Sequence, residues 1–175
     1  MKDLISKKQL LDFLKKNKIL FNLYDHPAMH SVEDSEKNRG QIEGIHTKNL
    51  FLKNKKNNFY LISCYEKQNI DLKKLSKSLG MGNVSFANQD RLYEMLGVKP
   101  GSVSPFGLIN DKGHEVVFYL DKKIFYSEMV NFHPLENTST LNMKTSDFII
   151  YCNLLDIFFN VFDFETYSII NKINE

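Results

Sequence analysis

The chain has 175 residues, of which 42% are hydrophobic, a size and composition typical of one domain that buries a sizeable core. Its 8 Gly and 4 Pro exclude collagen-like and low-complexity chains, and its 14 Phe and 8 Tyr exclude a disordered one. The net charge of +2, from 23 basic and 21 acidic residues, excludes a generic nucleic-acid coat protein, so any RNA-binding surface must be local.

The first part of the chain predicts two helices and a hairpin. Ser6 and Gln9 form a capping-box pair directly before an apolar, amphipathic stretch that ends in lysines, which predicts the first helix. A second short helix is expected after Ser31, as far as Gly40. Strands are expected at residues 20–24, 49–52 and 59–65. The last two flank the polar segment KNKKNN, which predicts a turn between them.

The second part continues the alternation of helices and strands. Helices are expected at residues 71–79, 89–96 and 146–155, the first two followed by glycine and the last capped by Thr145 or Ser146. Strands are expected at residues 106–109, 115–120, 139–143 and 157–162. The first two of these flank NDKG and predict a second hairpin. The last dozen residues, FETYSIINKINE, are interpreted as a terminal helix or a tail.

This order of elements predicts the α/β (α+β) class, because interspersed helices and hairpins give a mixed, largely antiparallel sheet surrounded by helices. We expect one domain over residues 1–164 and a C-terminal tail or short helix over 165–175. Cys64 and Cys152 lie inside apolar runs, which favours reduced core thiols in a cytoplasmic protein. No window reaches the roughly 20 apolar residues of a membrane span, so no membrane contact is expected.

Common catalytic signatures such as the Walker loop, HExxH, GxSxG and paired CxxC are missing from the sequence. His26 and His30 have the i, i+4 spacing of helical metal ligands, but Pro27 between them argues against a helix. We therefore expect no metal site and no cofactor.

Three polar segments interrupt apolar strands: HTKNLFL at 46–52, the loop at 100–107 and NFHPLENTST at 131–140. Taken singly, each has a plain structural interpretation: a solvated lysine, a turn and a structural histidine. A mixed sheet could bring all three to the mouth of one pocket. The set would then offer a cation, a rigid loop with outward backbone N–H groups and an imidazole, but no evident nucleophile. This suits a hydrolysis in which the protein stabilises an oxyanion and positions water.

The same segments resemble a known family. TKNLFL, IDLKKLSKSLG, VSFAN, LGVKPGSVSPFGLIND and NFHPLENTST, in this order, are similar to motifs of the YbaK-like prolyl-tRNA editing proteins. Among these, the chain most resembles the freestanding Ala-tRNA(Pro) deacylase branch, called PrdX or ProXp-ala. The resemblance implies a single YbaK-like domain and a trans-editing hydrolase that cuts a wrongly attached amino acid from tRNA. It also implies that the 2′-hydroxyl of the terminal ribose helps to activate water.

The resemblance implies a catalytic set of Lys48, Gly101, Ser102 and His133. Lys48 matches the family's functional lysine, which would hold the phosphate or the 3′-terminal adenosine. Gly101 and Ser102 begin the family's GxxxP loop, whose backbone N–H groups would bind the substrate carbonyl as charge develops. His133 matches the pocket histidine and would set pocket size and orientation more than act as a base.

The implied substrate-binding residues are Asn49, Val103, Ser104, Pro105, Thr47 and Ser31. Asn49 matches an asparagine next to the functional lysine and would contact the acceptor end. Two of these positions depart mildly from the family pattern: Ser31 and Ser104 each stand where threonine is frequent, and both keep the hydroxyl.

The expected partner is the acceptor end of mischarged tRNA(Pro), with prolyl-tRNA synthetase as a second candidate partner and no DNA. One alternative is a non-catalytic tRNA- or synthetase-binding regulator with the same fold. Another, within the enzyme class, is a deacylase of Cys-tRNA or of Ser/Thr-tRNA.

Overall fold

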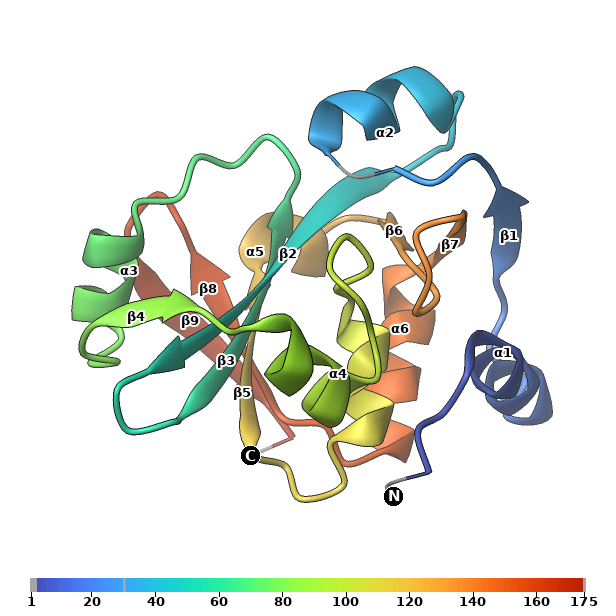
Figure 1. The fold of residues 1–175 in the computed structure, drawn as a ribbon. Helices are drawn as coiled ribbons and strands as arrows, with labels where there is room; N and C mark the ends of the chain where they lie inside the picture. Colours follow the sequence, from blue (N-terminus) through green and yellow to red (C-terminus); the bar gives the residue numbers. More distant parts are fainter. Residues whose placement is uncertain (1–2, 30, 175) are drawn as a thin grey trace.

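A mixed sheet of nine strands forms the frame of the molecule (Figure 1). The computed structural model describes residues 3–29 and 31–174. In chain order the elements are α1 (Lys7–Lys16), β1 (Asn22–Asp25), α2 (Val32–Asn38), β2 (Ile45–Asn54), β3 (Phe59–Tyr65), α3 (Leu72–Ser78), β4 (Val84–Phe86), α4 (Gln89–Leu96), the 3₁₀ helix η1 (Pro105–Asn110), β5 (Val116–Asp121), α5 (Lys122–Phe125), β6 (Met129–Phe132), β7 (Ser139–Lys144), α6 (Thr145–Leu154), β8 (Phe159–Asp163) and β9 (Ser168–Ile173).

The strand order is β1-β7-β6-β2-β3-β5-β8-β9, and β4 pairs with β2 outside this path. The pairs β2–β6, β3–β5 and β5–β8 are parallel and the others are antiparallel, which confirms the predicted mixed, largely antiparallel sheet. The long strand β2 lies at the centre: its first residues pair with β6, its middle with β3 and its last residues with β4. One strand therefore connects both halves of the sheet.

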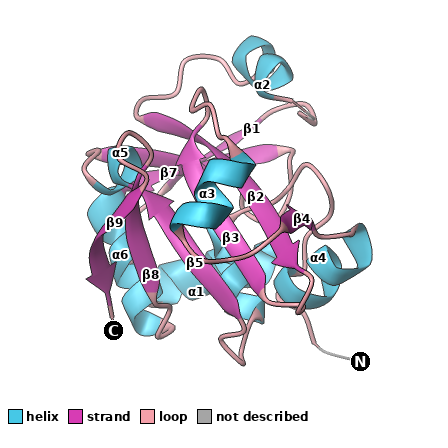
Figure 2. Ribbon diagram, turned by 90° about the vertical axis from the view of Figure 1, so that its left-hand side faces the viewer, coloured by secondary structure: helices cyan, strands magenta, loops and turns pink. Residues whose placement is uncertain are grey.

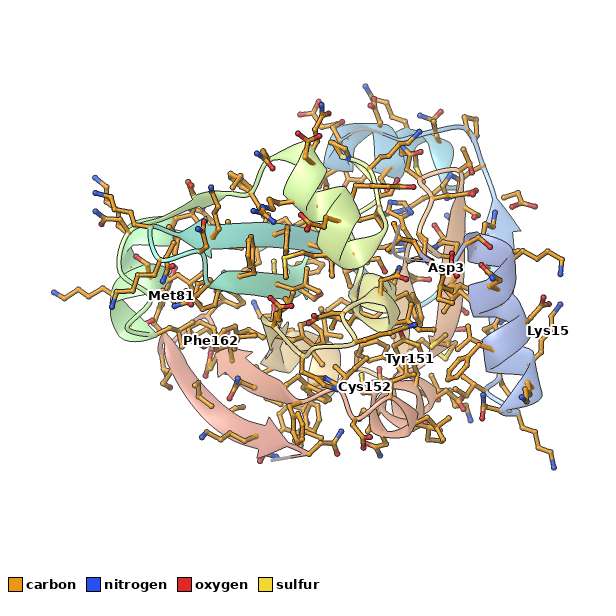
Figure 3. All side chains as sticks on the ribbon, turned by 60° about the horizontal axis from the view of Figure 1, so that its bottom comes forward. Asp3, Lys15, Met81, Tyr151, Cys152 and Phe162 are labelled. Carbon is orange, nitrogen blue, oxygen red and sulfur yellow. The ribbon has the colours of Figure 1, made fainter. Side chains whose placement is uncertain are left out.

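Helices cover the sheet on both faces, and each face has its own apolar cluster. The larger cluster includes Phe106, Phe148 and Tyr151, whose hydroxyl donates to the Phe106 carbonyl at 2.9 Å. The smaller cluster lies under α3, which crosses the sheet face turned to the viewer in Figure 2. Figure 3 shows the two clusters apart, with Met81 and Phe162 toward one end and Tyr151 and Cys152 toward the other.

Local sequence signals are confirmed at most helix ends. Ser6 and Gln9 form the capping box of α1, Ser31 accepts a hydrogen bond from the Asp34 N–H at the start of α2, and Gly97 ends α4 in the left-handed conformation. Cys64 and Cys152 are buried free thiols. Among the described helices, none is long and apolar enough to cross a membrane.

The predicted second hairpin is wrong. Residues 105–110 form η1 instead of a strand, and β5 runs parallel to β3 and β8 in the middle of the sheet. Pro105 has no N–H to donate to a ladder, and the Ser104 hydroxyl accepts from the Phe106 N–H at 3.2 Å, so the chain turns tightly here. The Asp111 carboxylate then accepts from the Val116 N–H at 2.8 Å, where β5 begins.

The C-terminal part also differs from the prediction. Residues 168–173 form strand β9, antiparallel to β8, where a helix or tail was expected. Neither Thr145 nor Ser146 caps α6; Lys144 is the N-cap residue, and no side chain caps this helix. The Thr145 N–H instead donates to the Glu128 carbonyl at 2.9 Å, because β7 leads directly into α6. The short strand β4 was not predicted.

Candidate active site

A cavity of about 250 Å³ lies where β2, the loop before η1 and the end of β6 meet, below α2. Its lining consists of Met29, Ser31, Val32, Ser35, Thr47, Lys48, Asn49, Glu66, Gly101, Val103 and His133. The three polar segments expected to share one pocket mouth are therefore brought together by the fold. The hollow beside α4 is larger, about 440 Å³, but its lining contains no histidine.

Lys48 lies on β2 opposite Cys64 of β3, and its side chain is half-buried in the cavity wall. Its ammonium group donates a hydrogen bond to the backbone carbonyl of Gln68, in the segment that follows β3. An ammonium group has three donors, so this contact fixes the lysine and leaves two N–H groups for a ligand. The position suits a cation that binds an anionic or polar group entering the cavity.

The neighbours of Lys48 on β2 link the cavity wall to the adjacent strands. Thr47 donates from its hydroxyl to the Asn131 carbonyl of β6 at 2.8 Å. The Asn49 side-chain oxygen accepts from the Ser63 hydroxyl of β3 at 2.5 Å. This bond orients the amide so that its NH₂ group, which has no partner among the described residues, is available to a ligand.

The backbone N–H groups of the loop before η1 differ in whether they already have a hydrogen-bond partner. Gly101 has φ +86°, which places it in the left-handed region. The Ser102 N–H is occupied in a turn with the Lys99 carbonyl at 3.0 Å. The N–H groups of Gly101, Val103 and Ser104 have no hydrogen-bond partner within the part of the chain that the structure describes. Of these residues, Gly101 and Val103 line the cavity.

Three predicted site residues of this loop do not line the cavity. Ser102, Ser104 and Pro105 are buried. The Ser104 hydroxyl caps η1, and Pro105 occupies the first turn of that helix. Their contacts hold the loop in shape beneath Gly101 and Val103. Ser31, the remaining predicted residue, lines the cavity from the N-terminus of α2.

His133 follows β6, and the contact of one ring nitrogen defines its tautomer. Nδ1 lies 3.0 Å from the Ser139 carbonyl oxygen, which can only accept, so Nδ1 carries the proton. Burial lowers the pKa of His133 below its usual value, and the nearby His26 ring acts in the same direction, while the Ser139 contact opposes both. The neutral ring thus has a lone pair on Nε2, with which it can accept a hydrogen bond.

A buried ion pair fixes α2 beside the cavity, and sequence reasoning missed it. The Arg39 guanidinium donates to both carboxylate oxygens of Glu66, at 2.5 and 2.9 Å, and a second pair joins Glu36 to Lys67 at 2.9 Å. The Glu66 side chain is only 5% exposed. No side chain of α2 is buried, and these ion pairs join the helix to the segment that follows β3. Residues 27 positions apart give no local signal of such a contact.

His26, considered above as a metal ligand, has both ring nitrogens engaged within the protein. Nδ1 contacts the Pro27 carbonyl at 2.9 Å and Nε2 the Thr140 hydroxyl at 2.9 Å. The other histidine of that pair, His30, lies outside the described residues. Within 3–29 and 31–174, no group of three or more His, Cys, Asp or Glu side chains could hold a metal ion.

Comparison with known proteins assigns the chain to a family. The sequence profile of the aminoacyl-tRNA editing domain matches residues 26–150, which include every candidate site residue from Ser31 to His133. The chain belongs to the aminoacyl-tRNA editing domain family. In this editing domain, α1 and the strands β1, β8 and β9 lie outside the matched range.

Two curated relatives of this editing domain have names that refer to prolyl-tRNA or its synthetase. The prolyl-tRNA editing protein ProX of Acetoanaerobium sticklandii is 34% identical over 146 residues, covering 83% of this chain and 89% of the relative. The prolyl-tRNA synthetase associated domain-containing protein 1 of Mus musculus is 36% identical over 132 residues, covering 73% and 78%. The identified family is therefore the YbaK/ProX group that the sequence motifs resemble.

Solved structures share the fold of the editing domain. A candidate trans-editing enzyme for prolyl-tRNA synthetase superposes with a TM-score of 0.63 at 18% identity, covering 84% of this chain and 92% of that one. A hypothetical protein, APE2540, gives a TM-score of 0.64 at 15% identity, covering 85% and 95%. At these identities the likeness establishes the fold alone.

Proposed function

We propose that this protein is a trans-editing deacylase that hydrolyses mischarged aminoacyl-tRNA, with Ala-tRNA(Pro) as its substrate, in the cytoplasm. The observation that carries the proposal is a cavity lined by Lys48, by His133 and by Gly101 and Val103, whose N–H groups have no partner among the described residues. Family membership supports the reaction class. The proline-related names of the relatives favour tRNA(Pro), with prolyl-tRNA synthetase as a candidate partner.

In this proposal Lys48 binds the acceptor end of the tRNA as a point charge. Its two unused N–H groups contact a phosphate or the terminal adenosine, and the Asn49 NH₂ group adds a neutral contact. The Gln68 carbonyl holds the ammonium in place before the substrate arrives. Lys48 therefore positions the ester and does not itself react.

The N–H groups of Gly101 and Val103 stabilise the oxyanion. Water attacks the ester carbonyl carbon, and negative charge develops on the carbonyl oxygen, where fixed donors are most effective. The bond between that carbon and the ribose oxygen then breaks, the ribose oxygen takes a proton, and the free amino acid leaves. The neighbouring 2′-hydroxyl helps to activate the water, so no side-chain nucleophile is needed.

The cavity wall selects the amino acid by size and so acts as a sieve. A synthetase site that fits proline cannot strongly exclude alanine, because a few methylene groups are worth only about 1–3 kcal/mol. A second site must therefore admit the small side chain and reject proline. Met29, Val32 and Val103 provide an apolar wall, and His133 limits the space and orients the substrate.

Single-turnover deacylation of Ala-tRNA(Pro), with Pro-, Ser- and Cys-tRNA(Pro) alongside, tests the proposal. Fast loss of alanine with proline retained is the expected result. Faster hydrolysis of Ser- or Cys-tRNA(Pro) would support the proposed reaction and change the proposed substrate. A protein that binds tRNA(Pro) and hydrolyses none of the four would instead be the non-catalytic regulator.

Substrate assistance has its own test. Ala-tRNA(Pro) with a terminal 2′-deoxyadenosine, charged at the 3′ position, should be hydrolysed far more slowly than the natural substrate. Equal rates on the two substrates would remove the 2′-hydroxyl from the mechanism while leaving the oxyanion contacts in place.

A further inference from the structure

Helix α3 carries lysines on its outward face. Lys73 and Lys77 are four residues apart and Lys74 is three residues before Lys77, so all three side chains lie on one side of the helix. The opposite side is buried, with Leu75 and Ser76 against the smaller apolar cluster. All three lysines are exposed.

The turn between β2 and β3 places two more exposed lysines next to this helix. Lys55 and Lys56 occupy the turn, and a hollow is lined jointly by them and by the residues that follow α3. The Asn54 side chain donates to the Met81 carbonyl at 3.0 Å and ties the turn to the end of the helix. Figure 3 shows long nitrogen-tipped side chains projecting into solvent around Met81.

We call Lys55, Lys56, Lys73, Lys74 and Lys77 the lysine track. Among the described residues, no carboxylate forms an ion pair with any of the five, whereas Lys7, Lys8, Lys67, Lys122 and Lys123 are all paired. The Lys74 ammonium nitrogen lies over the Tyr167 ring, 4.1 Å from its centroid. The five lysines therefore form a local group of positive charges on a chain whose net charge is only +2.

Within the candidate active site, Lys48 lies on the same face of the sheet as α3. Side chains alternate along β2, so Lys48 shares a face with Leu50 and Leu52, which pack in the cluster under α3. The contact of Lys48 with Gln68, in the segment between β3 and α3, agrees with this placement. Asn54 is six residues beyond Lys48, about 20 Å along the strand at roughly 3.3 Å per residue.

We infer that the lysine track binds the phosphate backbone of the acceptor-stem duplex while the 3′ end of the tRNA occupies the cavity. The inference rests on the proposed function and adds the duplex contact to it. A tRNA carries its amino acid on a short single strand, and the duplex begins a few nucleotides away. Flexible lysines suit this contact because phosphates are read as charge, without sequence, and each contact releases counterions.

The experiment compares two variants that lose the same charge. The track variant carries K55Q, K56Q, K73Q, K74Q and K77Q; the control carries K15Q, K16Q, K18Q, K112Q and K144Q, five exposed lysines elsewhere. Binding of an uncharged acceptor-stem minihelix and of a CCA trinucleotide is measured by fluorescence anisotropy over a salt series. Thermal unfolding confirms that each variant folds, and a four-substitution version that keeps Lys74 replaces the track variant if the Tyr167 contact proves necessary.

The track variant should bind the minihelix at least about tenfold more weakly than the wild type, and its salt slope should fall by about 3–4. The control variant should stay within about twofold, because screened distant charges contribute little. Trinucleotide binding should be equal in all three proteins. Equal weakening by both variants, or no loss in the track variant, would overturn the inference.

Measurements of hydrolysis distinguish a failure of this inference from a failure of the proposed function. With Ala-tRNA(Pro), the track variant should lose kcat/KM through KM and keep the wild-type single-turnover rate at saturating enzyme. A wild-type protein without hydrolytic activity would refute the proposed function, yet the minihelix comparison would still test the lysine track.

Discussion

Two partly buried histidines, His46 and His133, each donate one ring N–H to a backbone carbonyl, Ile42 and Ser139 respectively, at 3.0 Å. Burial is the largest influence on each ring and lowers the pKa of both below the usual value. Both rings are therefore neutral donors in the folded protein. In His133 this leaves Nε2 as an acceptor at the cavity, which is the property that the proposed sieve uses.

These lowered pKa values predict a loss of stability in mild acid. Below the ordinary histidine pKa of 6.5, the unfolded chain binds protons that the folded His46 and His133 do not, so protonation favours unfolding. The free energy of unfolding should fall as the pH drops from about 7 to about 5. Urea titrations of a H46Q/H133Q variant should show a flatter pH dependence than the wild type; equal slopes would refute neutral histidines.

Lys48→Met should reduce kcat/KM for Ala-tRNA(Pro) by about 10–100-fold, because a charge-assisted contact of about 1.5–3 kcal/mol is lost. The control is Lys53→Met, five residues along β2, on the opposite sheet face and outside the cavity lining. It should leave hydrolysis unchanged. If the two variants behave alike in single-turnover and binding assays, Lys48 does not have the assigned role.

Among the elements, η1 replaces a strand that the sequence predicts, because the residues at its start favour a helical turn. An apolar run at 106–109 resembles a strand when read alone, but Ser104 and Pro105 start a helical turn and Gly107 packs against Leu96. A Cβ at Gly107 would lie 2.9 Å from the Leu96 carbonyl oxygen, so the close approach requires glycine. This packing fixes η1 directly after the loop that lines the cavity.

Gly101→Ala should impair hydrolysis more than stability. A side chain at φ +86° costs about 1–2 kcal/mol, and relief of that strain would turn the Gly101 and Val103 N–H groups away from the carbonyl. We expect a rate loss of roughly 10–100-fold. Gly80→Ala is the control: its φ of +63° brings similar strain in open space, away from the cavity. Equal hydrolysis by both variants would exclude the loop as the oxyanion site.

At the scale of the whole molecule, β9 is the strand at one edge of the sheet and covers β8. Its residues pair with β8, and Tyr167 and Ile173 pack against the two apolar clusters. Without this strand, the edge of β8 would expose Val161, which is fully buried in the intact fold. An unpaired apolar edge strand is a site of aggregation.

Deletion of residues 166–175 should therefore lower stability by about 3 kcal/mol or more and promote aggregation, since two packed side chains and a strand pairing are lost. Thermal unfolding and light scattering measure both effects. A dispensable tail would give an unchanged Tm and a monodisperse protein. The Y126S variant, at a tyrosine that is 72% exposed, is the control for loss of an aromatic residue and should behave as the wild type.

The sequence predicted the parts of the site that short motifs describe. Lys48, Gly101 and His133 each lie in a segment whose residues interrupt an apolar pattern, and the structure brings all three to one cavity. It gave no indication of Glu66 or Arg39, because a buried ion pair between distant segments leaves no periodic pattern in either.

By itself, the sequence determined most helix caps, most strand runs, the fold class and the family motifs, because these depend on propensities and patterns within a few residues. Only the tertiary structure decided that β5 lies between β3 and β8, that β9 forms one edge of the sheet, and that the Ser102 N–H belongs to a turn. Strand partners and free N–H groups depend on which distant segments pack together. Local propensity does not determine which segments pack together; the burial of a common apolar core does.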